Sequence, residues 1–314
     1  MQAAKAAHPS HPRLTALVER ARQRAVQVSP AVGVVYPCDA LALEAAAGVL
    51  QLGIARPLLI GPRELILRAA DAAAIDAQGF EIIDTDVAPA QAALRATTLA
   101  RQGVITALMK GSLHTDELMS AIVHRELGLR TDKRISHAFV FDLPRYHKLL
   151  ALADCVVNIA PDLRTKRDIL GNAVALLQRL GIREPKVGIV AAVETVNPAI
   201  PATVDAQALV QLAREGAWPG AMVEGPFGFD NAFSAAAART KNIESGVAGD
   251  ADLLLMPDLN AGNMLYKSFN YVGGGDCAGL VLGAQVPVVL TSRADSLQSR
   301  LASVALAVLA SESP

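Results

Sequence analysis

Short runs of β-branched and other apolar residues alternate with longer, alanine-rich segments along most of this chain. Runs of the first kind occur at 31–36 (AVGVVY), 57–60, 80–84 and 104–109. The segments between most of these runs are ten or more residues long and carry apolar residues at helical spacing. Short strands separated by such helices are typical of βαβ units. The sequence therefore predicts an α/β fold with mainly parallel sheets and flanking helices.

A polar stretch at 128–134 (GLRTDKR) interrupts this series. We read it as the first crossing between two domains, because a second series of strands and helices follows it. Strands are expected near 136–141, 155–159, 186–193, 221–224 and 252–256. Helices are expected at 162–180 and 205–215.

The composition limits the partners that the chain can have. Among 314 residues, 29 basic side chains are interspersed with 30 acidic ones, so no basic stripe favours nucleic acid. No run approaches the roughly 18 apolar residues of a membrane span, and we expect no signal peptide in MQAAKAAHPSHPR. Cys38, Cys155 and Cys277 lack metal-binding spacing and favour free thiols in the cytoplasm.

The segment from Pro257 to Ser296 carries the densest set of polar residues at expected strand ends. An acidic, amide- and glycine-rich turn follows the apolar run 252–256, and a helical segment with Lys267 comes next. Further along, residues 291–295 (TSRAD) join an expected strand to the last helix. Open α/β sheets place ligands at such strand ends, and a helix N-terminus offers unpaired N–H groups to an anion. Arg293 adds a charged planar fork that matches phosphate or a developing oxyanion.

The same corner also fits a structural role. Ser292 and Asp295 have the spacing of a capping box for the amphipathic helix behind them. Capping does not require Arg293, and an arginine in the first turn of a helix has the wrong sign for the helix dipole. We therefore expect an anion there and leave both interpretations open.

A second turn of this kind follows the expected strand 104–109. Lys110 closes that strand, and His114 and Thr115 open the next helix. Lys110 and nearby backbone N–H groups would contact an anion. The alternative is a charged edge with an ordinary N-cap.

Several motifs together resemble those of the phosphate acetyltransferase and phosphate butyryltransferase family. The motifs are PDLNAGNMLYK at 257–267, VPVVLTSRADS at 286–296, MKGSLHT at 109–115, RISH at 134–137 and VEGPFGFDNAFS at 223–234. The resemblance covers roughly residues 30–310. The TSRADS and EGPFGFDNA segments look closer to the butyryltransferase branch.

The resemblance implies the fold of isocitrate and isopropylmalate dehydrogenases, in which the chain leaves one domain, builds a second and returns. Domain one would then comprise residues 1–134 and 286–314 and carry the Ser292–Arg293 turn. Domain two, residues 135–285, would carry the Asn260 turn and the interface of a homodimer. The two turns would face each other across one cleft.

The resemblance also implies an acyltransferase that moves a short-chain acyl group, acetyl or butyryl, reversibly between CoA and inorganic phosphate in a ternary complex. CoA is then a substrate, and we expect neither a metal nor another cofactor. Arg293 would bind phosphate and stabilise the oxyanion, Ser292 would orient phosphate or the thiol, and Asp295, or Asp258 in its place, would be the base. The expected substrate-binding residues are Lys110, His114, Thr115, Asp258, Asn260, Gly262, Asn263 and Lys267.

Two positions depart from the acetyltransferase pattern. An acid is typical where Ser299 stands, and an arginine is typical of the helix after the Lys110 turn, where no arginine precedes Arg125. The acetyltransferase base and second phosphate contact therefore cannot be transferred to this chain.

Two other functions remain as alternatives. A metal-dependent, nicotinamide-linked decarboxylating dehydrogenase would share the fold, but no GxGxxG motif follows an expected strand. A noncatalytic acyl-CoA-sensing module would also share it. The presence of Ser292 and Arg293 favours catalysis over sensing.

Overall fold

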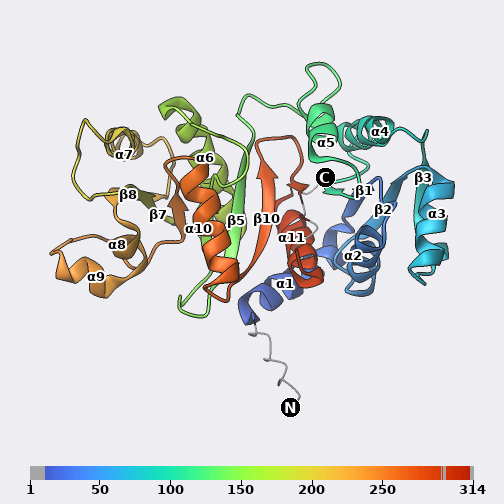
Figure 1. Cartoon of the computed structure of the whole chain (residues 1–314), viewed down its shortest axis with the longest axis horizontal. Coiled ribbons are helices and arrows are strands. Elements are labelled where there is room, and N and C mark those ends of the chain that lie inside the picture. The colour runs from blue at the N-terminus through green and yellow to red at the C-terminus, as the bar shows by residue number, and fades with distance from the viewer. Residues whose placement is uncertain (1–10, 291, 293–294, 312–314) are drawn as a thin grey trace, which may run out of the picture.

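The described part of the chain contains an 11-stranded sheet with helices on both faces (Figure 1). The computed structural model describes residues 11–290, 292 and 295–311. The strand order is β3-β2-β1-β4-β11-β10-β5-β6-β9-β7-β8. The strands are β1 (Ala31–Val35), β2 (Arg56–Gly61), β3 (Glu81–Asp84), β4 (Ala107–Lys110), β5 (Ser136–Asp142), β6 (Leu150–Ala153), β7 (Lys186–Val190), β8 (Met222–Phe227), β9 (Leu253–Leu255), β10 (Asp276–Leu282) and β11 (Val288–Val289).

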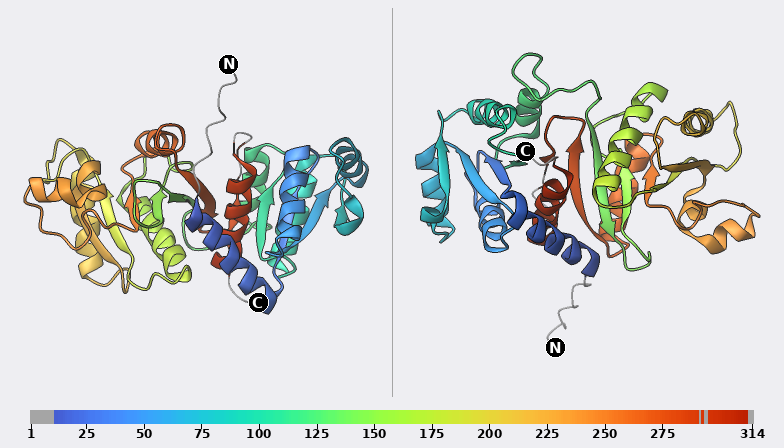
Figure 2. Two further views of the ribbon diagram at one scale, coloured as in Figure 1. Left: turned by 90° about the horizontal axis from the view of Figure 1, so that it is seen from below. Right: turned by 180° about the vertical axis from the view of Figure 1, so that it is seen from behind.

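Helices and strands alternate along most of the described chain, as the sequence predicted, but β5 and β6, α8 and α9, and β10 and β11 follow one another directly. The helices are α1 (Pro12–Val28), α2 (Ala40–Gln51), α3 (Arg63–Ala72), α4 (Pro89–Arg101), α5 (Thr115–Ile122), α6 (Leu163–Arg179), α7 (Pro201–Arg214), α8 (Phe229–Phe233), α9 (Ala235–Thr240), α10 (Leu259–Tyr271) and α11 (Leu297–Ala310). A 3-10 turn occupies Ala77–Gly79. In Figure 2, α10 lies on one face of the sheet and α1 and α6 lie on the other. No helix of the described residues is long and apolar enough to cross a bilayer.

Two groups of parallel strands make up most of the sheet. The strands β3, β2, β1, β4 and β11 run in one direction, and β6, β9, β7 and β8 run in the other. Between the groups lies the antiparallel pair β10 and β5, which runs from Asp276 opposite Asp142 to Leu282 opposite Ser136. The predicted α/β class with mainly parallel strands is confirmed. The expected separate sheets, however, are joined into one by this antiparallel pair.

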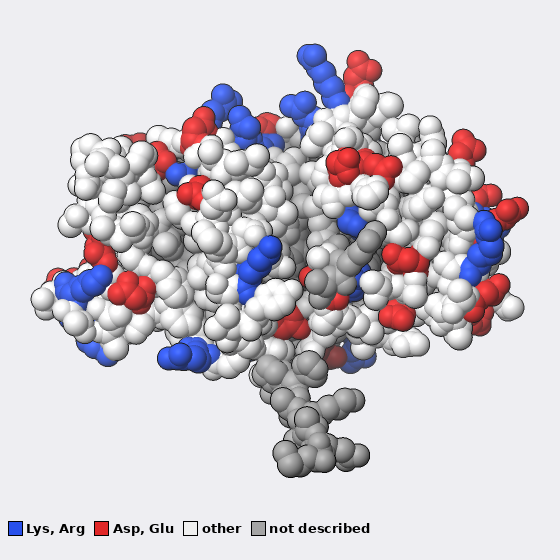
Figure 3. Space-filling model, in the orientation of Figure 1, with Lys and Arg blue, Asp and Glu red and all other residues white. Residues whose placement is uncertain are grey.

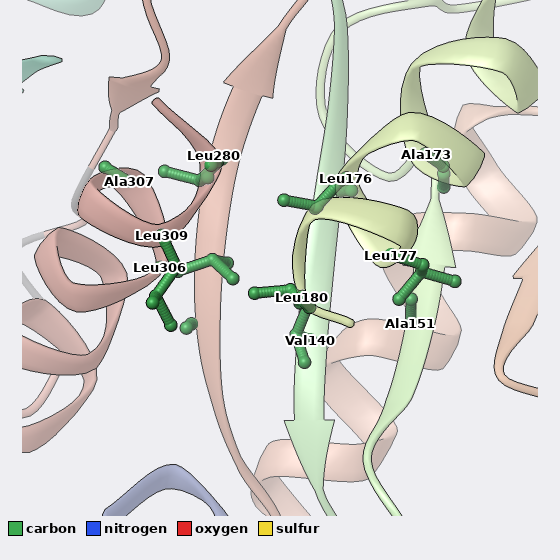
Figure 4. Packing of buried hydrophobic residues seen from close by; sticks show 14 of the residues in the cluster. Val140, Ala151, Ala173, Leu176, Leu177, Leu180, Leu280, Leu306, Ala307 and Leu309 are labelled. Carbon is green, nitrogen blue, oxygen red and sulfur yellow. The ribbon is translucent and has the colours of Figure 1, made fainter. Parts of the chain in front are cut away.

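The largest hydrophobic core joins the last helix to the middle of the sheet. Leu176 of α6 and Leu180, the C-cap of that helix, point toward Leu306 and Leu309 of α11 over β5 and β10 (Figure 4). All four side chains are buried. Because burial of a leucine contributes about 1.5–3 kcal/mol, this contact holds α11 against β10.

On the opposite face, α10 packs on β5 through aromatic rings. Tyr266 stacks on Phe139 with ring centroids 4.2 Å apart, and Phe269 meets Phe141 edge-on at 5.2 Å. Both arrangements suit the ring quadrupoles. The contacts fix the rotation of α10 about its axis and leave Lys267 exposed.

The expected strand at 155–159 is wrong. Residues 155–159 form an irregular segment, and the strand lies just before them as β6, which is buried throughout. The carboxylate of Asp154 accepts hydrogen bonds from the backbone N–H groups of Val156 at 2.8 Å and Val157 at 3.0 Å. An aspartate that bonds the backbone just ahead of it competes with strand pairing, and a pattern of β-branched residues does not reveal that competition.

The chain passes between the two halves of the sheet twice, and the two passages lie side by side. The backbone N–H of Gln285 donates to the carbonyl of Leu129 at 2.8 Å. The hydroxyl of Thr131 donates to the carbonyl of Gly283 at 2.7 Å. The polar stretch 128–134 is therefore hydrogen-bonded to the returning chain.

Candidate active site

Neighbouring strand ends bring the Lys110 turn and the Ser292 turn to one edge of the sheet. The parallel strands β4 and β11 pair with Met109 in register with Val289. Lys110 ends β4 and Ser292 follows β11, so the chain leaves the sheet at the same edge in both places. The strand β10 runs antiparallel to β11, which puts its first residue, Asp276, at that edge as well. Open α/β sheets bind ligands at such edges.

Ser292 and Asp295 form a closed turn between β11 and α11. The backbone N–H of Ser292 donates to the carboxylate of Asp295 at 2.7 Å. In return, the backbone N–H of Asp295 donates to the carbonyl of Ser292 at 3.2 Å. Arg293 lies outside the described residues. The structure therefore brings together two of the three predicted catalytic residues.

The predicted capping box at Ser292 and Asp295 is wrong. The helix α11 begins at Leu297, and its N-cap is Ser296, whose hydroxyl accepts from the backbone N–H of Ser299 at 2.9 Å. A serine closer to the helix takes the capping role, and the hydrogen bond to Asp295 closes a separate turn. The helix dipole therefore gives no reason to expect an anion at Arg293, because α11 begins only at Leu297.

Two carboxylates share this corner. Burial raises the pKa of Asp295, and the neighbouring charge of Asp276 raises it further, while the N–H of Ser292 and the charge of Arg300 act in the opposite direction. The hydroxyl of Ser299 donates to Asp276. The hydroxyl of Ser296 lies 3.4 Å from the same carboxylate. A carboxylate thus lies beside position 299, where the acetyltransferase pattern has an acid.

A cavity of about 500 Å³ opens between α10 and the start of α11. Its walls come from the C-terminal half of α10, the glycine-rich segment after it, Asp276, and the residues around the N-cap of α11. The described lining residues are His11, Tyr266, Asn270, Tyr271, Gly274, Gly275, Asp276, Asp295, Ser296, Gln298 and Ser299. Figure 3 shows the face of the molecule on which this region lies, hollowed between its two halves, with acidic and basic side chains scattered around it.

The predicted turn at the start of α10 is packed against the 154–155 backbone. Asp258 is the N-cap of α10 and accepts from the backbone N–H of Ala261 at 3.0 Å. Gly262 faces the backbone of Asp154, and the Asn263 side chain donates to the carbonyl of Cys155 at 3.1 Å.

The exposed residues of α10 lie on the same helix as the cavity wall. Asn260 and Lys267 are both exposed. Asn260 lies about 9 Å along the helix axis from Tyr266, at 1.5 Å per residue. The cavity is therefore lined by the second half of α10, and contact between its first turn and a substrate stays a prediction.

The Lys110 turn has a defined internal structure. The ammonium group of Lys110 donates to the carbonyls of Gly111 at 3.1 Å and Leu113 at 3.0 Å. His114 and Thr115 are exposed at the start of α5. Glu117 accepts the backbone N–H of His114 at 2.8 Å, so the first turn of α5 is stabilised by an acid, as helix termini prefer.

Asp276 and Arg300 are parts of this corner that the sequence analysis missed. Asp276 reaches it only through the antiparallel pairing of β10, which no local pattern reveals. Arg300 leaves a readable signal, because it is a charged residue four positions before Val304 on the buried face of α11.

Comparison with known proteins supports the resemblance seen in the motifs. The family model described as "Phosphate acetyl/butaryl transferase" matches residues 87–308. The chain belongs to this family. A phosphate acetyltransferase of Rhizobium meliloti is 48% identical over 282 residues, which is 90% of this chain and 89% of that protein.

Members of both branches of the phosphate acetyl/butyryltransferase family resemble this chain. A phosphate butyryltransferase of Clostridium acetobutylicum is 38% identical over 278 residues, covering 88% of this chain and 92% of that protein. The expectation of a closer likeness to the butyryltransferase branch is therefore wrong, since the acetyltransferase of Rhizobium meliloti is more similar.

The fold is also that of a solved family member. The crystal structure of a branched-chain phosphotransacylase from Enterococcus faecalis V583 superposes with a TM-score of 0.79 at 29% sequence identity. The match covers 90% of this chain and 98% of that one. Among the described residues of this chain, no group of three or more His, Cys, Asp or Glu side chains is placed to hold a metal ion.

Proposed function

We propose that this member of the phosphate acetyl/butyryltransferase family transfers a short-chain acyl group reversibly between CoA and inorganic phosphate. The observation that carries the proposal is the Ser292–Asp295 turn, which stands at one sheet edge with the Lys110 turn and beside a cavity of about 500 Å³. Acyl-CoA and phosphate give acyl phosphate and free CoA. The family names of the relatives support the same reaction.

The reaction proceeds by direct displacement at the thioester carbonyl. An oxygen of phosphate attacks the carbonyl carbon, negative charge grows on the carbonyl oxygen, and the C–S bond then breaks to release the CoA sulfur, which takes up the proton that the phosphate hydroxyl loses. Holding both substrates in line contributes roughly 7–11 kcal/mol, and a well-placed donor to the oxyanion contributes about 2.7–4 kcal/mol. Arg293 supplies that donor and binds phosphate, and Ser292 orients phosphate or the thiol.

In the direction that consumes free CoA, Asp295 is the proposed base that removes the thiol proton. Its carboxylate is partly buried beside the cavity, and its pKa is raised mainly by that burial. A base works best when its pKa approaches the working pH, so the shift is in the useful direction. Asp258 is the other candidate, and its carboxylate accepts the capping hydrogen bond of α10.

The remaining substrate contacts are proposed from the two turns. Lys110, His114 and Thr115 approach the anionic groups from the end of β4. A further set on α10 is proposed to contact the CoA chain on the other wall. Its members are Asn260, Asn263 and Lys267, whereas Gly262 is buried against the backbone of Asp154 and Cys155.

A thiol-release assay with acetyl-CoA or butyryl-CoA, with and without phosphate, tests the proposal. We expect CoA release that requires phosphate and yields acyl phosphate in equal amount. The two acyl-CoA substrates, which differ by two methylenes, are compared by kcat/KM, since each methylene discriminates by only about 1–3 kcal/mol. Tight CoA binding without phosphate-dependent release would favour the sensing module instead. Release of CO₂ and reduction of a nicotinamide from a hydroxy acid would favour the dehydrogenase.

We also propose the division into two domains, 1–134 with 286–314 and 135–285, in the manner of isocitrate and isopropylmalate dehydrogenases. The hydrogen bonds between residues 129–131 and 283–285 support it, because both boundaries fall at this paired crossing. A homodimer through the second domain, in the cytoplasm, completes the proposal. Light scattering on the purified protein measures the oligomeric state.

A further inference from the structure

Arg300 is a buried charge in the first turn of α11. The residue is 5% exposed. Burying a permanently charged group is costly unless hydrogen bonds compensate, and a cation at a helix N-terminus also opposes the helix dipole. Stabilisation of α11 therefore does not explain an arginine at this position. The explanation lies in the hydrogen bonds that the Arg300 side chain makes.

Those contacts lead to the Ser292–Asp295 turn. The Nη2 group of Arg300 donates to the carbonyl of Ser292 at 2.6 Å, and its Nε donates to the carbonyl of Asp295 at 3.3 Å. The two acceptors are the first and last residues of the turn. The carbonyl of Ser292 already accepts from the backbone N–H of Asp295, so the guanidinium uses its second lone pair.

The side chain of Arg300 links the turn to the rigid helix α11. The helix α11 is fixed to the sheet by its buried leucines, whereas the turn is closed by two hydrogen bonds of its own. The planar guanidinium reaches both ends of the turn from the helix, which a single ammonium group cannot do in the same way. A rigid helix that holds a reactive segment prevents small displacements of that segment. Such displacements cost about 10²-fold in rate.

We propose that Arg300 is a positioning residue, which holds the Ser292–Asp295 turn in its reactive geometry by binding both of its end carbonyls. Arg300 does not touch the substrates in this role. It acts through Ser292, Arg293 and Asp295, so the inference rests on the proposed function for its effect on rate. Its effect on the geometry of the turn does not depend on that function.

The charge of Arg300 gives the role a second signature. Arg300 lowers the pKa of Asp295, against the larger opposing effect of burial. Removing the guanidinium therefore moves the pKa of Asp295 further upward. In the direction that consumes free CoA, the acid limb of the pH–rate profile should move to higher pH.

The test compares Arg300→Met and Arg300→Lys with the control Arg24→Met. Arg24 donates to the carbonyl of Ser311 at 2.8 Å, at the opposite end of α11, so the control removes a similar contact from the same helix. We expect Arg300→Met to lower kcat about 10²-fold, with little change in the KM for CoA and the acid limb shifted upward. Arg300→Lys should fall between Arg300→Met and the wild type, because it keeps the charge and one donor. Arg24→Met should keep kcat and the pH profile.

Amide hydrogen exchange provides a readout that does not need activity. The N–H groups of Ser292 and Asp295 are both hydrogen-bonded within the turn, and both should exchange faster in Arg300→Met but not in Arg24→Met. Equal exchange in all variants would overturn the inference, as would loss of kcat in step with melting temperature in both Arg300→Met and Arg24→Met. If Arg300→Met fails to fold, Arg300→Lys carries the same comparisons. An inactive wild type would sink the proposed function and leave the exchange experiment decisive for Arg300.

Discussion

The hydroxyl of Ser299, in the first turn of α11, donates a hydrogen bond to the carboxylate of Asp276 at the start of β10. The two residues come from neighbouring elements that meet beside the Ser292–Asp295 turn. The acid that the acetyltransferase pattern has at position 299 is absent, and the carboxylate of Asp276 lies against that position instead. The corner therefore contains two carboxylates, Asp276 and Asp295, and the charge of Asp276 raises the pKa of Asp295.

Asp276→Asn should move the acid limb of the pH–rate profile to lower pH, measured in the direction that consumes free CoA. Burial is the main cause of the raised pKa of Asp295, and the charge of Asp276 adds to it. Removing that charge lowers the pKa, so Asp295 stays ionised to lower pH. The asparagine retains an oxygen that accepts from Ser299, which limits the structural change.

Asp76→Asn is the matched control for this experiment. Asp76 precedes β3, the edge strand at the far end of the sheet, and caps a short 3-10 turn there. The substitution removes the same charge without touching the corner. An acid limb that stays in place in Asp276→Asn, or that moves equally in both variants, would argue against electrostatic coupling to Asp295.

Arg293→Ala should lower kcat by roughly 10²–10³, the scale of losing one oxyanion donor, without unfolding the protein. The measurement is steady-state CoA release together with a thermal melt. Arg68→Ala, at an exposed position of α3, provides the control for loss of a surface arginine. Near-normal turnover in Arg293→Ala would remove the central assumption of the mechanism.

Ser296→Ala should cost about 1 kcal/mol of unfolding free energy, because it removes the N-cap of α11. Ser292→Ala should cost less stability, since it keeps the two backbone hydrogen bonds that close the turn. Its effect should appear in kcat instead. Denaturant unfolding and turnover on both variants separate the two roles, and a larger stability loss in Ser292→Ala would reinstate it as the cap.

The sequence predicted the parts of this fold that local rules govern. Alternating apolar runs and helical periodicity located most strands and helices, and Asp162 marked the start of α6 correctly. Local rules failed where a nearby polar group competes. Ser296 displaced Ser292 as the helix cap, and Asp154 turned an expected strand into an irregular segment.

The composition of the site was harder to predict, because it depends on pairing between distant segments. The Lys110 and Ser292 turns were identified because each follows its own strand. Asp276 entered the corner through the antiparallel strand β10, and the expectation of mainly parallel sheets hid that possibility. Arg300 could have been noticed as a charge on an apolar helix face, but its partners are backbone carbonyls that carry no sequence signal.

Gly262→Ala should lower the melting temperature, although alanine favours helices over glycine by about 1 kcal/mol. A Cβ at this position would lie 2.5 Å from the carbonyl oxygen of Asp154 and 3.1 Å from the Cα of Cys155. Both are backbone atoms that cannot move aside cheaply. Gly48→Ala in α2 is the matched control, because the new Cβ would meet only the flexible side chain of Leu301. A melting temperature that rises in both variants would show that α10 can move away from the 154–155 backbone.

Asp250→Asn should flatten the loss of stability at acid pH. Burial tends to raise the pKa of Asp250, but hydrogen bonds from Lys186, Lys148 and His147 outweigh it and hold the pKa well below its usual range. A carboxyl group with a lower pKa in the folded state binds fewer protons there than in the unfolded chain. Its contribution is therefore fully present above the unfolded value of about 3.9 and is lost as the pH falls below it toward the folded pKa. Melting temperatures of wild type and Asp250→Asn should differ by a constant amount above about pH 5 and converge as the pH falls from about 4 to 2, and curves that stay parallel down to about pH 2 would show that this cluster does not contribute to acid sensitivity.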